Sequence, residues 1–368
     1  MRESRPLPEN WDEWQWQMQN AISSIEQLEE WVDLNPDEKK AILATASRYR
    51  WRVTPYYASL MDPHDPACPI RRQVIPSLQE LRQYPHASAD PVGDTTYLKT
   101  RRVIHKYPDR AIILATEACA SYCRHCTRKY HTTALEGSYY NAANSSDWAD
   151  DFEYIAQTPQ IRDVLLTGGD PLVYSDDFLE FILSQLRLIP HVEIIRIGSR
   201  FPVFLPQRIT PKLCAILEKY GPVWFSTHFN HPKEITPQAA QAVDLLLHHG
   251  IPVQNQSVLL KGVNDNLDIM RSLLTRLVQI KVRPYYIYHC DNALGVSHFA
   301  TSLETGRAIM RGLTGFITGF AVPLYVLTTP IGKISLCEEK FTLNEGHYWV
   351  ENYHGDRMCV DDLLLSGE

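Results

Sequence analysis

The sequence predicts an α/β fold, with a barrel or partial barrel of parallel strands between an N-terminal helical region and a short C-terminal β extension. Six β-rich runs begin at residue 110, and after the first they start roughly 28–31 residues apart, the repeat of a strand with a returning helix. Nearly every run ends in polar residues, as expected at the carboxyl ends of barrel strands. The length of 368 residues suits one large α/β barrel.

The N-terminal region, residues 1–95, is predicted to be helical. Apolar residues recur at helical spacing over 10–34, until Asn35 and Pro36 end the pattern and a second helix follows over 37–49. The proline-rich segment 62–69 predicts a loop, and 86–96 predicts a linker. We therefore expect the barrel to occupy 96–314 and a C-terminal segment and tail to occupy 315–368.

The barrel elements follow in a regular order. Strands are predicted over 110–116, 164–170, 192–200, 223–230, 253–260 and 283–291. Helices are predicted over 176–188, 210–220, 236–250 and 266–280, several of them opening at Ser, Thr or Asn. The tail segment 341–355 has the pattern of a β-hairpin, placed either over the active site or against a neighbouring subunit.

The composition is that of a soluble globular protein. Hydrophobic residues make up 44% and charged residues 21%, and a formal net charge of −7 gives no overall attraction to nucleic acid. The longest uncharged apolar run, 315–327, is too short to cross a bilayer. No signal peptide pattern opens the chain, so we expect a cytoplasmic protein.

The clearest chemical motif is a cysteine loop after the first strand. Cys119, Cys123 and Cys126 follow the spacing CxxxCxxC, while the other five cysteines are scattered. Three thiolates on one short loop can hold three irons of a [4Fe–4S] cluster and leave the fourth iron open. The alternative is a zinc ion held by these thiolates and His125 or a distant ligand.

This loop resembles that of the radical S-adenosylmethionine (SAM) superfamily. The segments CRHCTRKY, LLTGGDPLV, HVEIIRIGSRFPVFLPQRIT, THFNHPKEIT, NQSVLLKGVND and RPYYIYHCD together resemble lysine 2,3-aminomutases, from about Trp11 to Lys333. The resemblance implies a radical SAM partial (β/α)6 barrel that holds a [4Fe–4S] cluster, SAM and pyridoxal phosphate (PLP).

The resemblance also implies residues for SAM. Gly168, Gly169 and Asp170 match the motif that binds the SAM amino group. Glycines allow close backbone approach, and a carboxylate accepts hydrogen bonds from an ammonium. His228 and Gln256 are expected to be further SAM contacts. The alternative is an ordinary turn for the Gly-Gly-Asp motif, and a buried, hydrogen-bonded polar residue for His228 and for Gln256.

For PLP, Lys333 in VLTTPIGKISL matches the family lysine that binds the cofactor covalently. Arg110 and Lys106 are expected at its phosphate, although the family usually has an arginine where Lys106 stands, and a lysine lacks the bidentate fork. Arg128 matches the anchor for the substrate carboxylate, where a guanidinium pairs bidentately. A solvated or merely structural charge is the alternative for each cation.

The substrate side chain is expected to be cationic. Asp291 matches the first of two aspartates that grip the side-chain ammonium in lysine enzymes, but the second position holds Thr328. One carboxylate can satisfy a guanidinium bidentately, so both lysine and arginine are candidates. Lysine 2,3-aminomutases bind zinc through a cysteine just after VND and a C-terminal cysteine cluster. This chain has Asn266 after VND and, beyond residue 337, only Cys359. The resemblance therefore indicates that the family zinc site is absent.

The resemblance therefore implies an isomerase that moves the α-amino group of lysine or arginine to C3, giving the β-amino acid. It would take its electron from a flavodoxin- or ferredoxin-type donor and form a homo-oligomer, with no nucleic-acid or membrane partner. Three alternatives remain: a lysyl-protein aminomutase acting on elongation factor P, the same PLP–radical machinery with another radical outcome, and a non-catalytic iron–sulfur or zinc protein.

Overall fold

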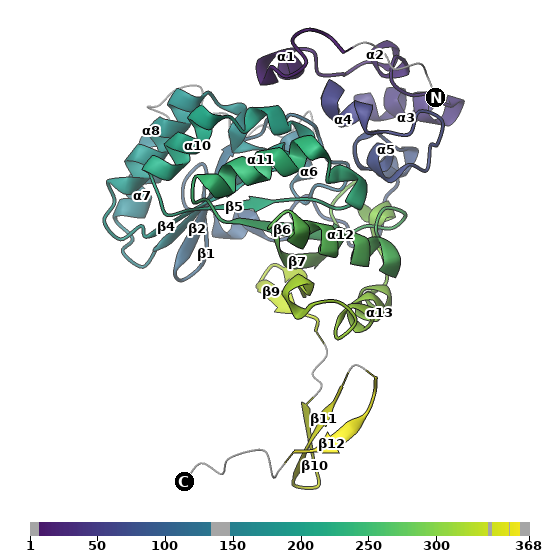
Figure 1. Ribbon diagram of the computed structural model, residues 1–368. Helices are drawn as coiled ribbons and strands as arrows, with labels where there is room; N and C mark the ends of the chain where they lie inside the picture. Colours follow the sequence, from purple (N-terminus) through teal and green to yellow (C-terminus); the bar gives the residue numbers. More distant parts are fainter. Residues whose placement is uncertain (1–6, 134–147, 338–340, 353, 361–368) are drawn as a thin grey trace.

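The computed structural model describes residues 7–133, 148–337, 341–352 and 354–360. Seven neighbouring strands run parallel in one open, barrel-like sheet (Figure 1): β2 (Arg110–Thr116), β3 (Asp163–Gly168), β4 (Ile194–Gly198), β5 (Val223–Thr227), β6 (Val253–Leu259), β7 (Arg283–His289) and β8 (Leu324–Thr329). The predicted fold class and all six predicted strands are confirmed. The seventh parallel strand, β8, lies at the end of the apolar run and was not predicted.

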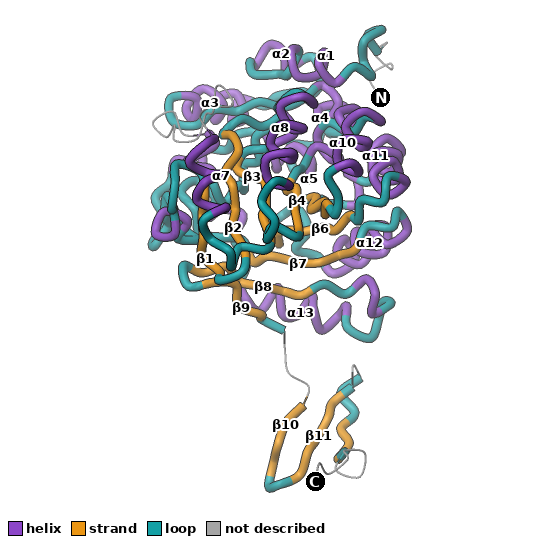
Figure 2. The backbone as a smooth tube through the Cα atoms, turned by 90° about the vertical axis from the view of Figure 1, so that its left-hand side faces the viewer, coloured by secondary structure: helices purple, strands orange, loops and turns teal. Residues whose placement is uncertain are grey.

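The two edges of the sheet are antiparallel strands. β1 (Val103–Tyr107) pairs with β2, and β9 (Gly332–Ser335) pairs with β8. The two edge strands lie near each other (Figure 2). Side chains join the two edges of the sheet in place of a strand ladder: the Tyr107 hydroxyl accepts the Lys333 N–H at 3.0 Å, and Lys106 Nζ donates to the Thr329 carbonyl at 2.6 Å. These contacts bring the beginning and the end of the barrel together around Lys333.

Helices cover the outside of the sheet (Figure 1). The predicted helices are confirmed, with N-caps at Ser175, Thr210, Thr236 and Asn266. Apolar side chains of each helix face the strands, as Leu179, Leu183 and Leu186 do in the first of them. The outer helices are α7 (Ala149–Ala156), α8 (Asp176–Arg187), α10 (Pro211–Lys219), α11 (Pro237–His248), α12 (Leu267–Gln279) and α13 (Leu303–Leu313).

The N-terminal region is helical but more broken than predicted. The pattern over 10–34 is not one helix, because Ile22 forms an isolated bridge with Val53 and Ser24 then caps a new helix. The region contains α1 (Trp14–Gln19), α2 (Ile25–Glu29), α3 (Pro36–Ala46), α4 (Pro55–Ser59) and α5 (Pro69–Val74). None of the described helices of the chain is both long and apolar enough to cross a lipid bilayer.

The predicted tail hairpin is confirmed, and a third strand joins it. β10 (Phe341–Asn344) pairs with β11 (His347–Glu351), which pairs with β12 (Arg357–Cys359). Figures 1 and 2 show this small sheet apart from the barrel, beyond β9, so it does not lie over the barrel strands. One ring contact, between Phe316 and His354 with centroids 6.0 Å apart, links it to the segment after α13.

Candidate active site

The cysteine loop leaves the carboxyl end of β2 and ends at the short helix α6 (Lys129–Thr133). Its three thiols, Cys119, Cys123 and Cys126, are half-buried and unpaired by disulfides. Burial raises the pKa of Cys119, with further contributions from Asp170 and from the other two thiols. The three thiols therefore lie on one loop, near enough for the charge of one to affect the pKa of another.

The glycines at the end of β3 allow that strand to approach the cysteine loop. A side chain at Gly168 would lie 2.6 Å from the Thr116 carbonyl, and one at Gly169 would lie 2.4 Å from the Ala118 carbonyl. Gly168 also has a φ of +121°, a conformation that other residues rarely adopt. Both glycines are thus required by the contact between β3 and the cysteine loop.

Asp170 is buried beside this contact. Its carboxylate accepts hydrogen bonds from the Leu172 N–H at 3.1 Å, the Ser199 hydroxyl at 3.0 Å and the Arg200 N–H at 2.7 Å. Burial raises the pKa of Asp170 to about 7, while these donors oppose the rise. A carboxylate has about four acceptor positions, so one remains for a ligand donor.

A buried arginine contacts one thiol directly. Arg200 Nη1 lies 3.0 Å from Sγ of Cys123, and its Nη2 donates to Gln73 at 2.6 Å and Glu234 at 2.8 Å. Gln73 belongs to α5 and Glu234 to the turn η6 (Pro232–Glu234). The N-terminal region and the barrel therefore jointly fix this cation against the cysteine loop.

Two histidines lie beside the loop as neutral rings. Burial lowers the pKa of His228 to about 3 and that of His125 well below its usual value, with Arg200 adding to both shifts. His125 Nε2 is 3.2 Å from Asn230 Nδ2. Among the described residues, no three His, Cys, Asp or Glu side chains converge on the position of a single metal ion. His228 Nε2 is buried, has no hydrogen-bond partner among those residues and fits a ligand contact.

Lys333 projects over the interior of the barrel. Its ammonium lies 5.0 Å from the ring centre of Tyr286 and 5.1 Å from that of Tyr288 on β7. The side chain is open to solvent, but the dense protein surroundings of Nζ lower its pKa to about 8, helped by the cations Arg196 and Arg110. A lysine of lowered pKa beside two tyrosine rings fits the covalent PLP site.

The predicted phosphate cations differ in their availability. Arg110 stacks on the Tyr107 ring, with Cζ 3.9 Å from its centre, and pairs with Asp109 at 2.8 Å. Lys106 Nζ instead donates to the carbonyls of Val92 at 2.9 Å and Thr329 at 2.6 Å, so two of its three hydrogens hold the barrel edges together.

Sequence reasoning missed Arg196, a further cation near Lys333. It stands between the fully buried Ile195 and Ile197 in β4, and its Nε donates to Asp163 of β3 at 2.7 Å. Because strand residues alternate between faces, an arginine between two outward-packed isoleucines must point into the barrel. That alternation in EIIRIG was the signal that could have revealed it.

The predicted substrate residues Arg128 and Asp291 also lie together. Arg128 Nε donates to Asp94 of η2 (Asp94–Tyr97) at 2.8 Å. Burial raises the pKa of Asp291 to about 6, although Thr127 and the Arg128 charge oppose the rise. Asp291 Oδ1 is buried and has no hydrogen-bond partner among the described residues. A cationic group of a ligand would satisfy it.

Thr328 and Lys333 are directly paired across β8 and β9. Side chains of a cross-strand pair lie on one face of a sheet, so Thr328 faces the same interior as Lys333. Gln256 on β6 also takes part, since its Oε1 accepts from the Tyr288 hydroxyl at 3.2 Å. The structure thus brings the predicted PLP, SAM and substrate residues to one barrel interior.

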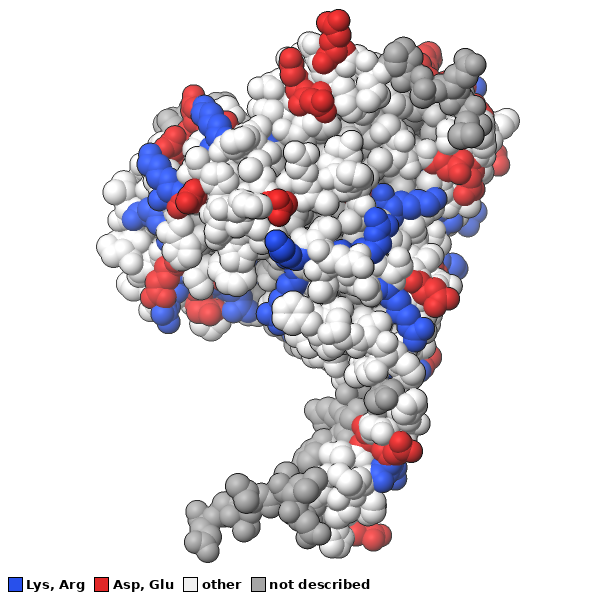
Figure 3. Space-filling model, in the orientation of Figure 1, with Lys and Arg blue, Asp and Glu red and all other residues white. Residues whose placement is uncertain are grey.

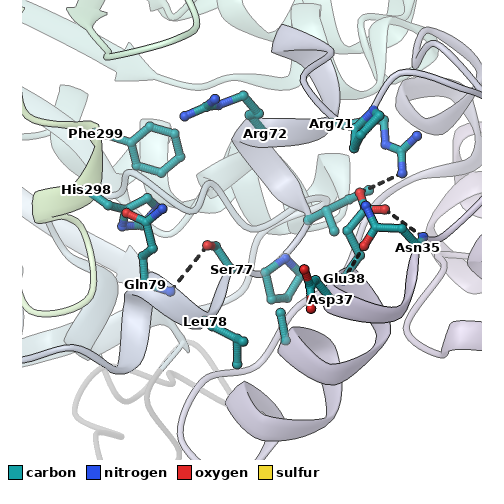
Figure 4. A pocket seen from close by; sticks show the side chains of 14 residues that line it. Asn35, Asp37, Glu38, Arg71, Arg72, Ser77, Leu78, Gln79, His298 and Phe299 are labelled. Carbon is teal, nitrogen blue, oxygen red and sulfur yellow. Dashed lines mark hydrogen bonds and ion pairs between the residues drawn. The ribbon is translucent and has the colours of Figure 1, made fainter.

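A separate hollow of about 380 Å³ lies between the N-terminal helices and the turn η7 (Ser297–Phe299), as Figure 4 shows. Its lining includes the buried ion pair of Arg71 and Glu38, at 2.6 Å, and the side chains of Arg72 and His298. None of the predicted site residues lines it. The hollow is therefore distinct from the candidate active site.

Comparison with known proteins agrees with this site. A model of the radical SAM superfamily matches residues 113–273. An L-lysine 2,3-aminomutase of Fusobacterium nucleatum is 48% identical, covering 88% of this chain and 75% of that protein. One of Clostridium subterminale is 47% identical, covering 88% and 77%. A glutamate 2,3-aminomutase of Clostridioides difficile is 41% identical, covering 88% and 76%. The chain therefore belongs to the lysine 2,3-aminomutase family of radical SAM isomerases, which use a [4Fe–4S] cluster, SAM and PLP.

Proposed function

We propose that this chain is a PLP-dependent 2,3-aminomutase that moves the α-amino group of a basic L-amino acid, lysine or arginine, to C3. The similar proteins include enzymes named for lysine and for glutamate, so family membership leaves the substrate side chain open. The observation that carries the proposal is the buried, unpartnered Oδ1 of Asp291 in the barrel interior. A glutamate side chain would meet repulsion there, whereas a cation would complete the site.

Cys119, Cys123 and Cys126 would hold the cluster, and the iron without a cysteine would remain for SAM. Asp170 supports this assignment with one unused acceptor position beside the cysteine loop, and His228 supports it with a buried, unpartnered Nε2. The remaining proposed SAM contacts are Gly168, Gly169 and Gln256. When bound, these groups supply the radical that abstracts a substrate hydrogen, and PLP carries the migrating nitrogen.

Lys333 would hold PLP covalently. Its pKa of about 8 leaves a usable fraction of neutral, nucleophilic amine near physiological pH. Arg110 and Arg196 would meet the phosphate, with Lys106 contributing its third hydrogen from the edge of the barrel. Tyr286 and Tyr288 flank the lysine and keep the cofactor region narrow.

Arg128 would bind the substrate carboxylate, and its hydrogen bond to Asp94 orients the guanidinium before substrate arrives. Asp291 would bind the side-chain cation, with Thr328 as a neutral neighbour where lysine enzymes have a second carboxylate. Binding at both the carboxylate and the side-chain cation would hold C2 and C3 of the substrate in one orientation.

The test is an anaerobic reaction of the reconstituted protein. Iron, sulfide and PLP are loaded, SAM and dithionite are added, and lysine, arginine, ornithine and glutamate are offered separately. Chromatography with mass detection is expected to show a same-mass β-amino isomer from lysine or arginine and none from glutamate. A Cys126→Ala variant controls for cluster-independent chemistry.

An isomer from glutamate alone would contradict the assignment of Asp291. If none of the free amino acids reacts while cluster and PLP are fully loaded, the free-amino-acid proposal fails. The lysyl-protein reaction on elongation factor P and the other radical outcomes are then the readings to pursue.

A further inference from the structure

Three arginines stand at alternate positions in the sequence SRYRWR, just before α4. Arg48 and Arg50 are exposed, while Arg52 is half-buried between them and the interior. We call Arg48, Arg50 and Arg52 the arginine strip. The intervening Tyr49 and Trp51 are buried, Arg48 and Arg50 face the outside, and the Arg52 guanidinium is turned towards the cysteine loop.

The strip is bonded directly to the cysteine loop. The Arg52 guanidinium donates to the carbonyl oxygen of Cys119, and the Arg52 carbonyl accepts the Tyr122 N–H at 3.0 Å. Two positions further along the chain, the Thr54 N–H donates to the Ser121 hydroxyl at 3.0 Å. A single half-buried side chain thus connects the protein surface with the backbone of the first predicted cluster ligand.

The middle residue of the strip, Arg50, is bonded to the same loop. The Arg50 N–H donates to the Thr133 carbonyl at 2.7 Å, and its carbonyl accepts from Arg124 Nη1 at 2.9 Å. Arg124 is itself fully buried between Cys123 and Cys126 in the sequence. Arg50 and Arg52 are therefore both hydrogen-bonded to the segment that carries the cysteines.

The charges of the strip are not neutralised locally. Over the described ranges, neither Arg48, Arg50 nor Arg52 forms an ion pair with a carboxylate. The Arg52 Nε is buried without a partner among these residues. The bond from Arg52 to the cysteine loop is what distinguishes the strip from other exposed cations.

The outer helices of the barrel give the contrast. Lys212 pairs with Asp177 at 3.0 Å and Lys219 with Glu180 at 2.6 Å. Figure 3 shows acidic and basic side chains interspersed on that part of the surface. The hollow in Figure 4 is likewise mixed, because Arg71 and Arg72 share it with Asp37 and Glu38. Neither region therefore has an electrostatic potential of a single sign.

We propose that the arginine strip docks a small acidic protein that carries one electron, and that the electron enters the cluster beside Cys119. The inference rests on the proposed function, because a cluster that cleaves SAM must first be reduced from outside. One electron passes from the reduced centre of the carrier to the cluster; the carrier is oxidised by one electron and the cluster changes from the 2+ to the 1+ state. The positive charge of the strip would steer the acidic carrier into a complex in which the distance between its redox centre and the cluster is short.

The test uses the full, cluster-loaded protein and photoreduced flavodoxin in a stopped-flow experiment that follows bleaching of the cluster. The R48E/R50E variant is expected to reduce the second-order rate by about 10- to 1000-fold at low salt, the range of electrostatic steering. For the wild-type protein the rate should fall steeply as salt rises, since exposed charges are screened. The matched control, K212E/K219E on α10, changes net charge equally and should react as the wild type does.

Dithionite separates this inference from the proposed function. Being a small chemical reductant, it should reduce R48E/R50E and support isomer formation at the wild-type rate, which also shows that the variant is folded and loaded. Equal flavodoxin rates for R48E/R50E and wild type would overturn the docking site, as would equal losses in the α10 control or a salt-independent wild-type rate. Absence of isomer with dithionite in the wild type would instead refute the proposed function.

Discussion

Arg200 Nη1 lies 3.0 Å from Sγ of Cys123, deep in the protein and next to the paired carboxylate of Glu234. Burial opposes its charge, but the Cys123 thiol and Glu234 keep the pKa of Arg200 above its ordinary value. The chain thus places a permanent cation against one ligand of the proposed cluster. Hydrogen bonds and charge at the sulfur atoms are among the factors that set the potential of such clusters.

Arg200→Gln should make the midpoint potential of the cluster more negative. A positive neighbour stabilises the more negatively charged reduced state, and the substitution removes it. The measurement is a redox titration of the loaded protein followed by electron paramagnetic resonance. Arg200→Lys, which keeps the positive charge, should leave the midpoint potential close to that of the wild type. Glu234→Gln, which removes a negative charge, should make the midpoint potential more positive. Identical potentials in all three variants would show that Arg200 acts only on packing.

Asp291→Asn should lower kcat/KM for the basic substrate by about 30-fold or more, because breaking a buried charge pair typically costs about 2–5 kcal/mol. Since burial raises the pKa of Asp291 to about 6, its charge is present above that pH and lost below it. The kcat/KM of the wild-type enzyme should therefore fall as pH decreases through about 6. Asp291→Asn should not show this decline; if it does, another group titrates there.

Covalent uptake of PLP should depend on pH through Lys333. The dense protein surroundings of Nζ, with Arg196 and Arg110, lower the pKa of this lysine to about 8, and only the neutral amine attacks the aldehyde. The rate of uptake, followed by absorbance, should therefore rise up to about pH 8 and then level off. Removing one cation in Arg110→Gln should move the midpoint upward. A wild-type midpoint near 10, the ordinary lysine value, would contradict this environment.

The barrel strands and the cysteine loop could be predicted because they depend on local pattern. Strand alternation, N-caps and motif spacing are all contained in short stretches, and the predicted strands appear as β2 to β7. Contacts between distant segments were not predictable. The hydrogen bond from Lys106 to Thr329 spans 223 residues, and the one from Arg52 to Cys119 spans 67. These depend on how the elements pack, which no short stretch specifies.

Glu80→Gln should destabilise the fold by about 3–5 kcal/mol, the usual cost of leaving a buried charge unpaired. Glu80 of η1 (Leu78–Leu81) is buried against Arg124 and Lys129 of the cysteine loop. Burial opposes its ionisation, but these two cations lower the pKa of Glu80 to about 2.

Urea unfolding of the metal-free protein measures this loss. Because the folded pKa of Glu80 is depressed, its contribution should be complete above about pH 4.3, the unfolded value, and should disappear as pH falls towards 2. The control is Glu193→Gln, whose ion pair with Arg162 has side chains 51% and 62% exposed. That change should cost no more than about 1 kcal/mol. If both variants lose the same free energy of unfolding, the buried group of Glu80, Arg124 and Lys129 stabilises the fold no more than an exposed ion pair does.

Thr328→Asp should raise the ratio of kcat/KM for lysine to that for arginine. Thr328 is paired with Lys333 across β8 and β9, so a carboxylate there faces the same interior as Asp291. An ammonium has three donors in a compact head and gains from a second acceptor, whereas a planar guanidinium can be satisfied bidentately by one carboxylate. Competition between lysine and arginine in one anaerobic reaction measures the ratio directly. Thr328→Asn, of similar size but uncharged, should leave the ratio near that of the wild type. An unchanged ratio in Thr328→Asp would place Thr328 outside the side-chain pocket and leave Asp291 as the residue that selects the cation.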